Sequence, residues 1–335
     1  MNDLHSLLHS LGVWGDSVKL CLVFCLILFG GWLGGGSSAI AADVRLIAVI
    51  MANSQLRSQE IHAVFVKNSQ EFCGDNCRIY VQTPNSDTMS MRNSVRKAVA
   101  LDADLILTYG PVAALAAKTE APPIPTLFAD VYDPVKLELV SAKTLTGRNM
   151  TGIRGDAPLQ TLFKYFTEAT KARKLAILYD INSPVDNLQR QVLEDVGRKK
   201  GMDVVLLPVD KKKDSMTALQ AIAPDVDGLF LANSDHNETQ FKEILTFASE
   251  RQLPVLTQRA GSADIGAFMV LETSPVEQGE KLAEIAGLVL SGSKTVDIPM
   301  YKPRQVAFIV NLKLAKEYGL QIPFQTLSVA SRIIH

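Results

Sequence analysis

The sequence lacks the patterns by which most enzymes and nucleic-acid-binding proteins are identified. It contains no phosphate-binding loop of the form GxxxxGK[ST] or GxGxxG, no GxSxG turn for a serine nucleophile and no cysteine–histidine spacing typical of zinc. Its 34 basic and 35 acidic residues leave a formal net charge of −1, which argues against a large basic surface. We therefore expect a protein that is not an enzyme, needs no cofactor or metal and has no nucleic-acid partner.

Tryptophan and long apolar runs are scarce, and both occur near the N-terminus. The two tryptophans lie within the first 41 residues, as does the mostly apolar segment 20–33. This segment is shorter than the roughly 20 residues that a membrane-spanning helix needs. Ala39-Ile40-Ala41 has the small-x-small pattern of a signal peptidase site. We predict a signal peptide over residues 1–41 and export to the periplasm, with an uncleaved membrane anchor as the alternative.

Cysteine is also rare, with four in the chain and two of these in the predicted leader. The other two, Cys73 and Cys77, flank the sequence Gly-Asp-Asn, a turn that can bring their sulfur atoms together. In an oxidising compartment this spacing favours a structural disulfide. A redox-active pair of the thioredoxin kind is the alternative, although that motif has two intervening residues rather than three.

What the sequence does contain is two successive series of short apolar strands that alternate with helices. The first series has predicted strands at 44–51, 78–82, 103–110 and 124–130, and helices at 58–70, 89–101 and from 111. A segment rich in glycine and turn formers, 148–158, is interpreted as a crossover. The second series has predicted helices at 159–170, 186–200, 215–222 and 237–251, and strands at 174–180, 203–209, 226–233 and 253–258. This alternation predicts an α/β protein with two Rossmann-like lobes, each built on a parallel sheet, joined by a hinge.

Polar residues cluster where the predicted strands end. Ligands of open parallel α/β sheets bind outside the carboxyl ends of the strands, so we predict a ligand site formed by these residues. The first lobe supplies Asn53, Ser54, Tyr109, Gly110, Pro111, Asp130 and Asp133. The second lobe supplies Asp180, Asn233, Asp235 and Arg259.

If the ligand resembles an amino acid, the charged residues of this set have candidate roles. Asp130 or Asp133 could pair with its ammonium group, and Asp235 is another candidate. Arg259, or the helix N-terminal amides after Gly110, could hold its carboxylate through charge-assisted or dipole-aligned hydrogen bonds.

Each of these roles has a structural alternative. Asp133 precedes a proline and could form a turn, and Asp235 could cap the helix that follows it. Tyr109 could stack on the side chain of the ligand or pack in the core. Arg259 could pair with a surface carboxylate instead of the ligand.

Three stretches carry a resemblance to a known family: 129–153, 226–237 and 289–323. The third is the most specific, because a helix ending in Ser-Gly is followed by an Ile-Pro step, a strand and the pattern Asn-Leu-Lys-x-Ala-Lys-x-x-Gly. The chain resembles the periplasmic substrate-binding proteins of ABC transporters, of the tryptophan/tyrosine type. The resemblance covers nearly all of the sequence after the leader.

The resemblance implies a type I periplasmic-binding-protein fold. Lobe 1 would comprise residues 42–154 plus about 273–302, and lobe 2 residues 155–272 plus about 303–335. The protein would be a monomer that captures a small molecule, an aromatic or branched amino acid, between its lobes for a membrane permease. The alternative is a periplasmic receptor that reports its ligand to a membrane signalling protein.

Two stretches depart from the pattern of this family. Residues 51–62 lack its usual His-Pro step after the first strand, and residues 272–279 read ETSPVEQG instead of an Asp-Tyr-Tyr-type run. Both stretches lie near the expected ligand site, so the resemblance leaves the identity of the ligand open.

Overall fold

The strands of the protein form two sheets in the computed structural model, which describes residues 44–52, 56–140, 149–210, 212–233 and 240–335. The first sheet has five parallel strands in the order β2-β1-β3-β4-β5. They are β1 (Arg45–Ile50), β2 (Cys77–Gln82), β3 (Leu105–Tyr109), β4 (Thr126–Val131) and β5 (Met150–Arg154). The ends of β1 to β4 lie within two residues of the predicted ones.

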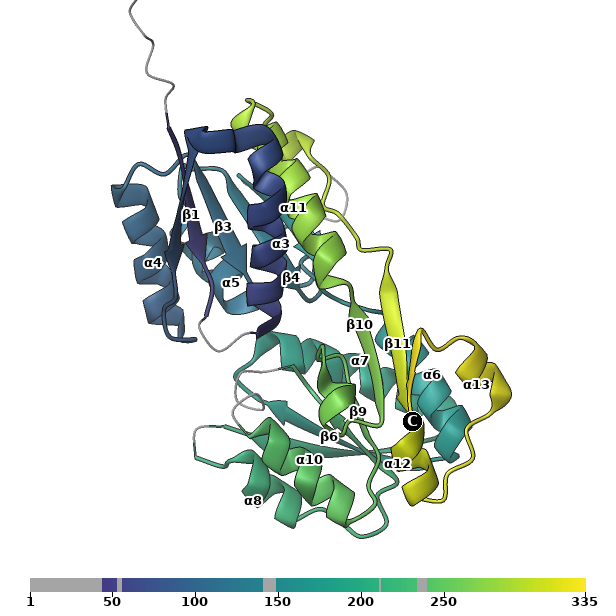
Figure 1. Cartoon of the computed structure of the whole chain (residues 1–335). Helices are drawn as coiled ribbons and strands as arrows, with labels where there is room; N and C mark the ends of the chain where they lie inside the picture. The colour runs from purple at the N-terminus through teal and green to yellow at the C-terminus, as the bar shows by residue number, and fades with distance from the viewer. Residues whose placement is uncertain (1–43, 53–55, 141–148, 211, 234–239) are drawn as a thin grey trace, which may run out of the picture. The chain divides into compact units, whose positions relative to one another are not determined.

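Helices cover both faces of the first sheet because the side chains of its strands alternate in direction. Ile47 and Val49 of β1 pack with α3 (Leu56–Cys73) and α11 (Pro275–Leu290). Ala48 and Ile50 pack on the opposite face, with the helices α4 (Thr88–Ala100) and α5 (Pro111–Glu120). Figure 1 shows α3 and α11 side by side, although α11 is more than 200 residues further along the chain.

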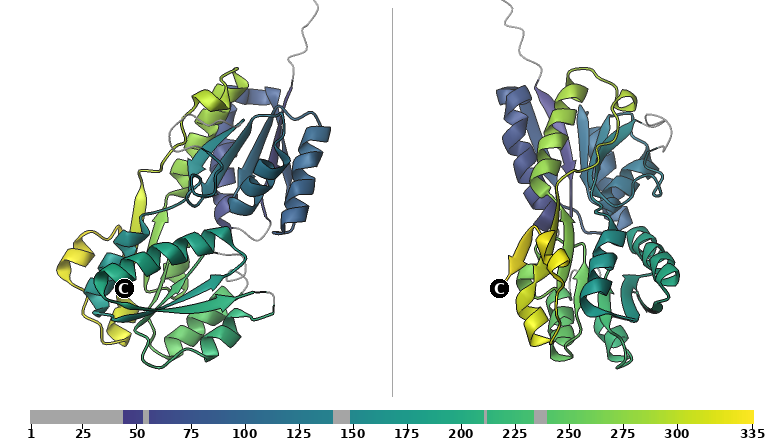
Figure 2. Two further views of the ribbon diagram at one scale, coloured as in Figure 1. Left: turned by 180° about the vertical axis from the view of Figure 1, so that it is seen from behind. Right: turned by 90° about the vertical axis from the view of Figure 1, so that its right-hand side faces the viewer.

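The second sheet has seven strands in the order β12-β11-β10-β9-β8-β6-β7. They are β6 (Lys174–Asp180), β7 (Asp203–Val209), β8 (Gly228–Leu231), β9 (Val255–Thr257), β10 (Met269–Thr273), β11 (Val306–Asn311) and β12 (Arg332–Ile334). The strands β10 and β11 pair antiparallel, and the other pairs of this sheet are parallel. Figure 2 shows these two strands alongside each other.

The second sheet is also covered on both faces. One face packs with α6 (Leu159–Thr170), α7 (Pro184–Lys200) and α12 (Leu312–Glu317), beside the short helix α13 (Phe324–Ser328). The other face packs with α8 (Ser215–Gln220) and α10 (Phe241–Glu250). Three single-turn helices, η1 (Gly74–Asn76), η2 (Ser262–Ile265) and η3 (Thr295–Asp297), lie in connections. The predicted α/β class with two mostly parallel sheets is confirmed.

The interpretation of 148–158 as a crossover is wrong in its first half, where the chain forms strand β5. The reason is a close approach of backbones at Gly152. A Cβ atom at this position would lie 2.1 Å from the carbonyl oxygen of Phe128 in β4. Only glycine at position 152 therefore lets β5 pair this closely with β4. The crossover begins only at Gly155.

The chain passes between the two sheets three times, and hydrogen bonds join these passages. The first follows β5, the second lies between β10 and α11, and the third leads into β11. The Arg154 amide donates to the Tyr301 carbonyl over 3.0 Å, which links the first passage to the third. The Ser274 amide donates to the Gln305 carbonyl over 3.0 Å, which links the second to the third.

Cys73 and Cys77 form a disulfide, as predicted, with their Cα atoms 5.2 Å apart. The bond joins the last residue of α3 to the first residue of β2 across the η1 turn. Within the described part of the chain, no helix has the length and apolar character that crossing a bilayer requires.

Candidate functional site

Asp130, near the end of β4, has the backbone conformation that is most unusual for a strand residue. Its φ of 58° lies in the left-handed region, which residues with a Cβ atom rarely adopt. The pairing register between β4 and β5 shifts between Phe128 and Val131, on either side of it. Strained backbone of this kind persists only where the surroundings hold it, and it is concentrated at functional sites.

Two polar side chains hold Asp130 in this position. Its carboxylate Oδ1 accepts a hydrogen bond from Nε of Arg57 over 2.7 Å, in an ion pair whose side chains are 19% and 16% exposed, respectively. Its backbone amide donates to Oε1 of Gln278 over 3.0 Å. Arg57 belongs to the first turn of α3 and Gln278 to the first turns of α11, so both helices of one face support this residue.

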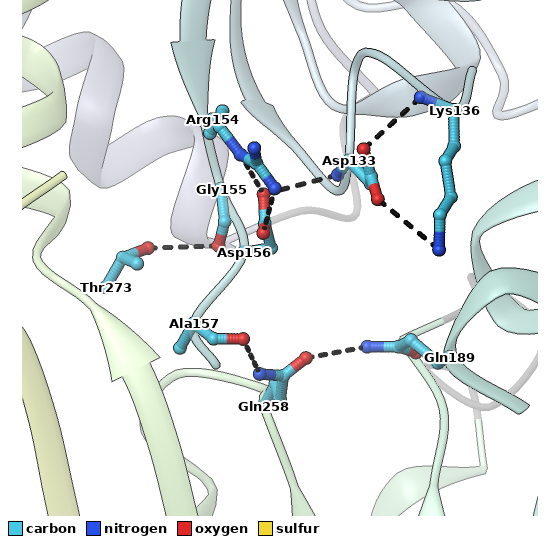
Figure 3. A network of polar contacts seen from close by, with 9 residues as sticks. All are labelled: Asp133, Lys136, Arg154, Gly155, Asp156, Ala157, Gln189, Gln258 and Thr273. Atoms are coloured by element: carbon cyan, nitrogen blue, oxygen red, sulfur yellow. Dashed lines mark hydrogen bonds and ion pairs between the residues drawn. The ribbon is translucent and has the colours of Figure 1, made fainter. Parts of the chain in front are cut away.

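Thr273, the last residue of β10, joins this pair to the passages between the sheets. Nη2 of Arg57 donates to the Thr273 carbonyl over 2.8 Å and also to its hydroxyl. The hydroxyl accepts a second hydrogen bond from Nε2 of Gln278 over 3.0 Å and donates to the Gly155 carbonyl over 3.1 Å. Figure 3 shows the contact between Thr273 and Gly155. Thr273 and Gln278 are fully buried, so the network is shielded from solvent on this side.

Gly155 lies directly against Asp130. A Cβ atom at Gly155 would be 2.6 Å from Oδ1 of Asp130 and 2.7 Å from its carbonyl carbon. Such distances are well inside van der Waals contact. Only glycine therefore leaves room for the conformation that Asp130 adopts.

Asp133 forms a turn, which is the structural alternative to contact with a ligand. Its Oδ1 accepts a hydrogen bond from the Lys136 amide over 3.2 Å, and Oδ2 lies 3.8 Å from the Lys136 ammonium (Figure 3). Its own amide donates to Asp156 over 3.2 Å, and the Asp156 carboxylate receives two hydrogen bonds from Arg154, over 2.8 and 2.6 Å. The hydrogen bonds with Asp156 raise the pKa of the Arg154 guanidinium. Burial, followed by the charges of Asp156 and Asp133, raises the pKa of the Tyr132 phenol, which therefore stays protonated.

Tyr109, Gly110 and Pro111 mark the junction of β3 and α5. Tyr109 is 1% exposed in this structure, and its hydroxyl lies 3.2 Å from Nδ1 of His62. Burial raises the pKa of Tyr109 and lowers that of His62. Gly110, with a φ of 79°, donates its amide to the Ala129 carbonyl over 2.9 Å, and Pro111 begins the helix. Tyr109 thus packs in the core of this structure. Contact of Tyr109, Gly110 or Pro111 with a ligand stays a prediction.

Asn233, just after β8, is tied to the first passage by two buried glutamines. Its amide donates to Oε1 of Gln189, whose Nε2 donates to Oε1 of Gln258 over 3.0 Å. Gln258 in turn donates to the Ala157 carbonyl over 2.7 Å, as Figure 3 shows. The chain of amides thus links the end of β8 to the segment that leaves the first sheet.

Two other predicted residues of the second sheet, Asp180 and Arg259, have local partners. Oδ1 of Asp180 accepts a hydrogen bond from the Asn182 amide over 2.8 Å, in a turn after β6. The guanidinium carbon of Arg259 lies 4.1 Å from the ring centre of Phe241, a cation–π arrangement. Asn53, Ser54 and Asp235 lie outside the described residues. For all of these positions ligand binding stays a prediction.

Sequence reasoning missed Arg57, Thr273 and Gln278, which are central to the network. A signal for them was nevertheless present, because Arg57 lies in one of the two stretches that depart from the family pattern, and Thr273 and Gln278 lie in the other. The two departures contact each other in the structure. Among the described residues, no cluster of three or more metal-ligating side chains is found.

Comparison with known proteins gives a matching family, a relative and solved structures of the same fold. The model of the ABC transporter substrate binding protein family matches residues 67–334. A tyrosine-binding protein from Clostridioides difficile (strain R20291) is 25% identical over 249 residues, which are 74% of this chain and 72% of that protein.

Two solved structures share the fold over 87% of this chain and 99% of their own. One is an ABC domain from Streptococcus pneumonia in complex with L-Trp, with a TM-score of 0.79 and 20% identity. The other is a conserved domain protein from Vibrio cholerae O1 biovar El Tor, with a TM-score of 0.81 and 19% identity.

Proposed function

Because the chain belongs to the ABC transporter substrate binding protein family, we propose that its solute is an amino acid with an aromatic or branched side chain. The observation that carries this proposal is the ion pair of Arg57 and Asp130 at the carboxyl edge of the first sheet. It offers a cation and an anion side by side, the arrangement that complements a zwitterion. The tyrosine named for one relative and the L-Trp bound to one structural neighbour also support it.

Asp130 would bind the ammonium group of the ligand. Its carboxylate keeps part of its surface exposed while Oδ1 is held by Arg57. Asp180, Asn233, Asp235 and Arg259 would approach from the second lobe. A charge that is buried when two lobes close needs a partner, and an amino acid whose two charges both find one meets this requirement.

The remaining parts of the proposal concern the whole protein. The leader over residues 1–41 would direct export to the periplasm and be removed there. The monomeric protein would then deliver its ligand to an ABC-type permease. The lobes would be residues 42–154 plus about 273–302 and residues 155–272 plus about 303–335, with the three passages as the hinge. No finding favours the alternative of a receptor for a signalling protein.

A thermal-shift screen of residues 42–335 against the twenty amino acids, small organic acids and nucleosides tests the proposal. A ligand present at about 100 times its Kd stabilises the protein by about 2.7 kcal/mol, which raises the Tm by several degrees. We expect such a shift with one or a few aromatic or branched amino acids. Since residues 42–335 contain no tryptophan, bound L-tryptophan would also be visible by its own fluorescence. A shift with only another class of compound would overturn the proposed ligand.

A further inference from the structure

We infer that Arg57 is the residue that makes the site select zwitterions over simple amines, by positioning and neutralising the Asp130 carboxylate. This inference rests on the proposed function, in which Asp130 binds the ammonium group of the ligand. It assigns to Arg57 a role in specificity, and to Thr273 and Gln278 a role in holding Arg57 and Asp130 in place.

The backbone of Asp130 shows that this carboxylate is held where it would not otherwise lie. A residue with a Cβ atom at a φ of 58° needs restraints to keep it there. Three residues provide these restraints. Arg57 binds the carboxylate of Asp130, Gln278 binds its amide, and Gly155, which has no side chain, packs against its main chain. Without Arg57, the side chain would lose the contact that sets its direction.

The planar guanidinium suits this task in a way that an ammonium does not. Nε contacts Asp130 while Nη2 contacts Thr273, so one rigid group joins the end of β4 to the end of β10. A lysine has a single point charge and could not make both contacts with the same geometry. The fork of arginine therefore fixes the carboxylate relative to the passage between the sheets.

The local charge explains the selectivity. The side chains of Arg57 and Asp130 are 16% and 19% exposed, so their charges are only partly screened by water. An amine that binds Asp130 would place two cations beside one carboxylate. An amino acid brings its own carboxylate and keeps the charge of the site balanced. Like-charge repulsion thus disfavours the amine only as long as position 57 is cationic.

The test compares L-tyrosine with tyramine and with 3-(4-hydroxyphenyl)propanoate, and uses the corresponding compounds of tryptophan and leucine. Binding is measured by calorimetry on the full chain, expressed with its leader and purified after export. For the unaltered protein we expect the amine and the deaminated acid each to bind about tenfold or more weakly than the amino acid, the scale of a lost charge-assisted contact. An amine that binds as tightly as its amino acid overturns the inference, whatever the variants do.

Variants of Arg57 distinguish a role in ligand specificity from a purely structural role. Arg57→Gln should lower the discrimination between amino acid and amine by about tenfold, because the repulsion is gone. Arg57→Lys should weaken binding of the amino acid but keep the discrimination, since the charge remains. The matched control Arg198→Gln removes an arginine charge from a surface pair with Asp195, at a side chain that is 76% exposed, so it should keep both the affinity and the discrimination. A purely structural role predicts instead that Arg57→Gln weakens all ligands equally, and this result would overturn the inference.

Failure of the inference differs from failure of the proposed function. If the unaltered protein binds none of the three amino acids but binds another class of compound, the proposed function fails, and the inference falls with it. If it binds an amino acid but Arg57→Gln leaves the discrimination unchanged, the inference alone fails.

Discussion

Asp130 and Gly155 depend on each other at the scale of single residues. The left-handed backbone of Asp130 brings its main chain and its carboxylate within 3 Å of the place where a side chain at Gly155 would begin. Either residue could be changed only if the other moved. The position of the Asp130 carboxylate thus depends on the absence of a Cβ atom at position 155.

We expect Gly155→Ala to destabilise the fold by about 1–3 kcal/mol, the cost of inserting a methyl group into a packed site. It should also reduce the ligand-induced rise in Tm, because Asp130 must move. The measurements are urea unfolding and thermal shift. Gly201→Ala serves as the control, since no atom lies within 4 Å of its Cβ position and only its φ of 64° is unfavourable. Equal effects of the two variants on ligand binding would contradict this account of Gly155.

At the scale of elements, Glu277 attaches helix α11 to the third passage between the sheets. Its carboxylate accepts hydrogen bonds from the amides of Arg304 and Gln305, over 2.9 and 2.8 Å, and from the Tyr301 hydroxyl over 2.8 Å. Burial opposes its ionisation, but these hydrogen bonds outweigh it and lower the pKa of the Glu277 carboxyl below its ordinary value of 4.5. The ionised form therefore stabilises the fold.

The pH dependence of this contribution has a defined sign. Because the pKa is lower in the folded state, the stabilisation is fully present above about pH 5 and is lost as the pH falls through the folded-state pKa. We expect Glu277→Gln to lower the free energy of unfolding by about 1–3 kcal/mol at pH 7, and by much less at pH 3. Urea unfolding at both pH values measures this.

Glu284→Gln is the control for this prediction. Glu284 lies on the same helix, is 59% exposed and pairs with Lys281 at the surface. Surface pairs of this kind contribute about 0–1 kcal/mol. A loss at pH 7 that is no larger for Glu277→Gln than for Glu284→Gln would show that the contacts with the third passage do not stabilise the fold.

Most helices and strands could be predicted from the sequence, because the periodicity of apolar residues and the residues typical of helix and strand ends are local features. The ranges predicted for β6, β7 and α6 agree with the structure at both ends, and α5 begins at the predicted proline. Strand β5 could not be recognised, because its Gly152 is explained by the close approach to β4, a contact between segments that are separate in the sequence. The same reason applies to the site. Asp130 was predicted from its place at the end of a strand. Arg57, in contrast, lies 73 residues from Asp130 in the sequence and 216 residues from Thr273.

At the scale of the whole molecule, the disulfide and the leader test the same prediction of export. An exported chain should lose residues 1–41, and the two remaining cysteines, Cys73 and Cys77, should be oxidised. We expect the intact mass of the protein purified after export to equal that of residues 42–335 less two hydrogen atoms. A mass that includes the leader would support the membrane-anchor alternative, and two titratable thiols would contradict the disulfide.

The pairing of α3 with α11 also sets the order in which the protein can fold. One face of the first sheet is covered by α3, with Ile61 and Phe65, together with α11, so its cover is complete only after residues 275–290 have been synthesised. The strands of that sheet, in contrast, are complete by residue 154. A nascent chain that stops between these two points exposes the part of this apolar layer that α11 covers in the complete protein. The N-terminal half therefore cannot finish folding by itself, and its completion waits for the last fifth of the chain.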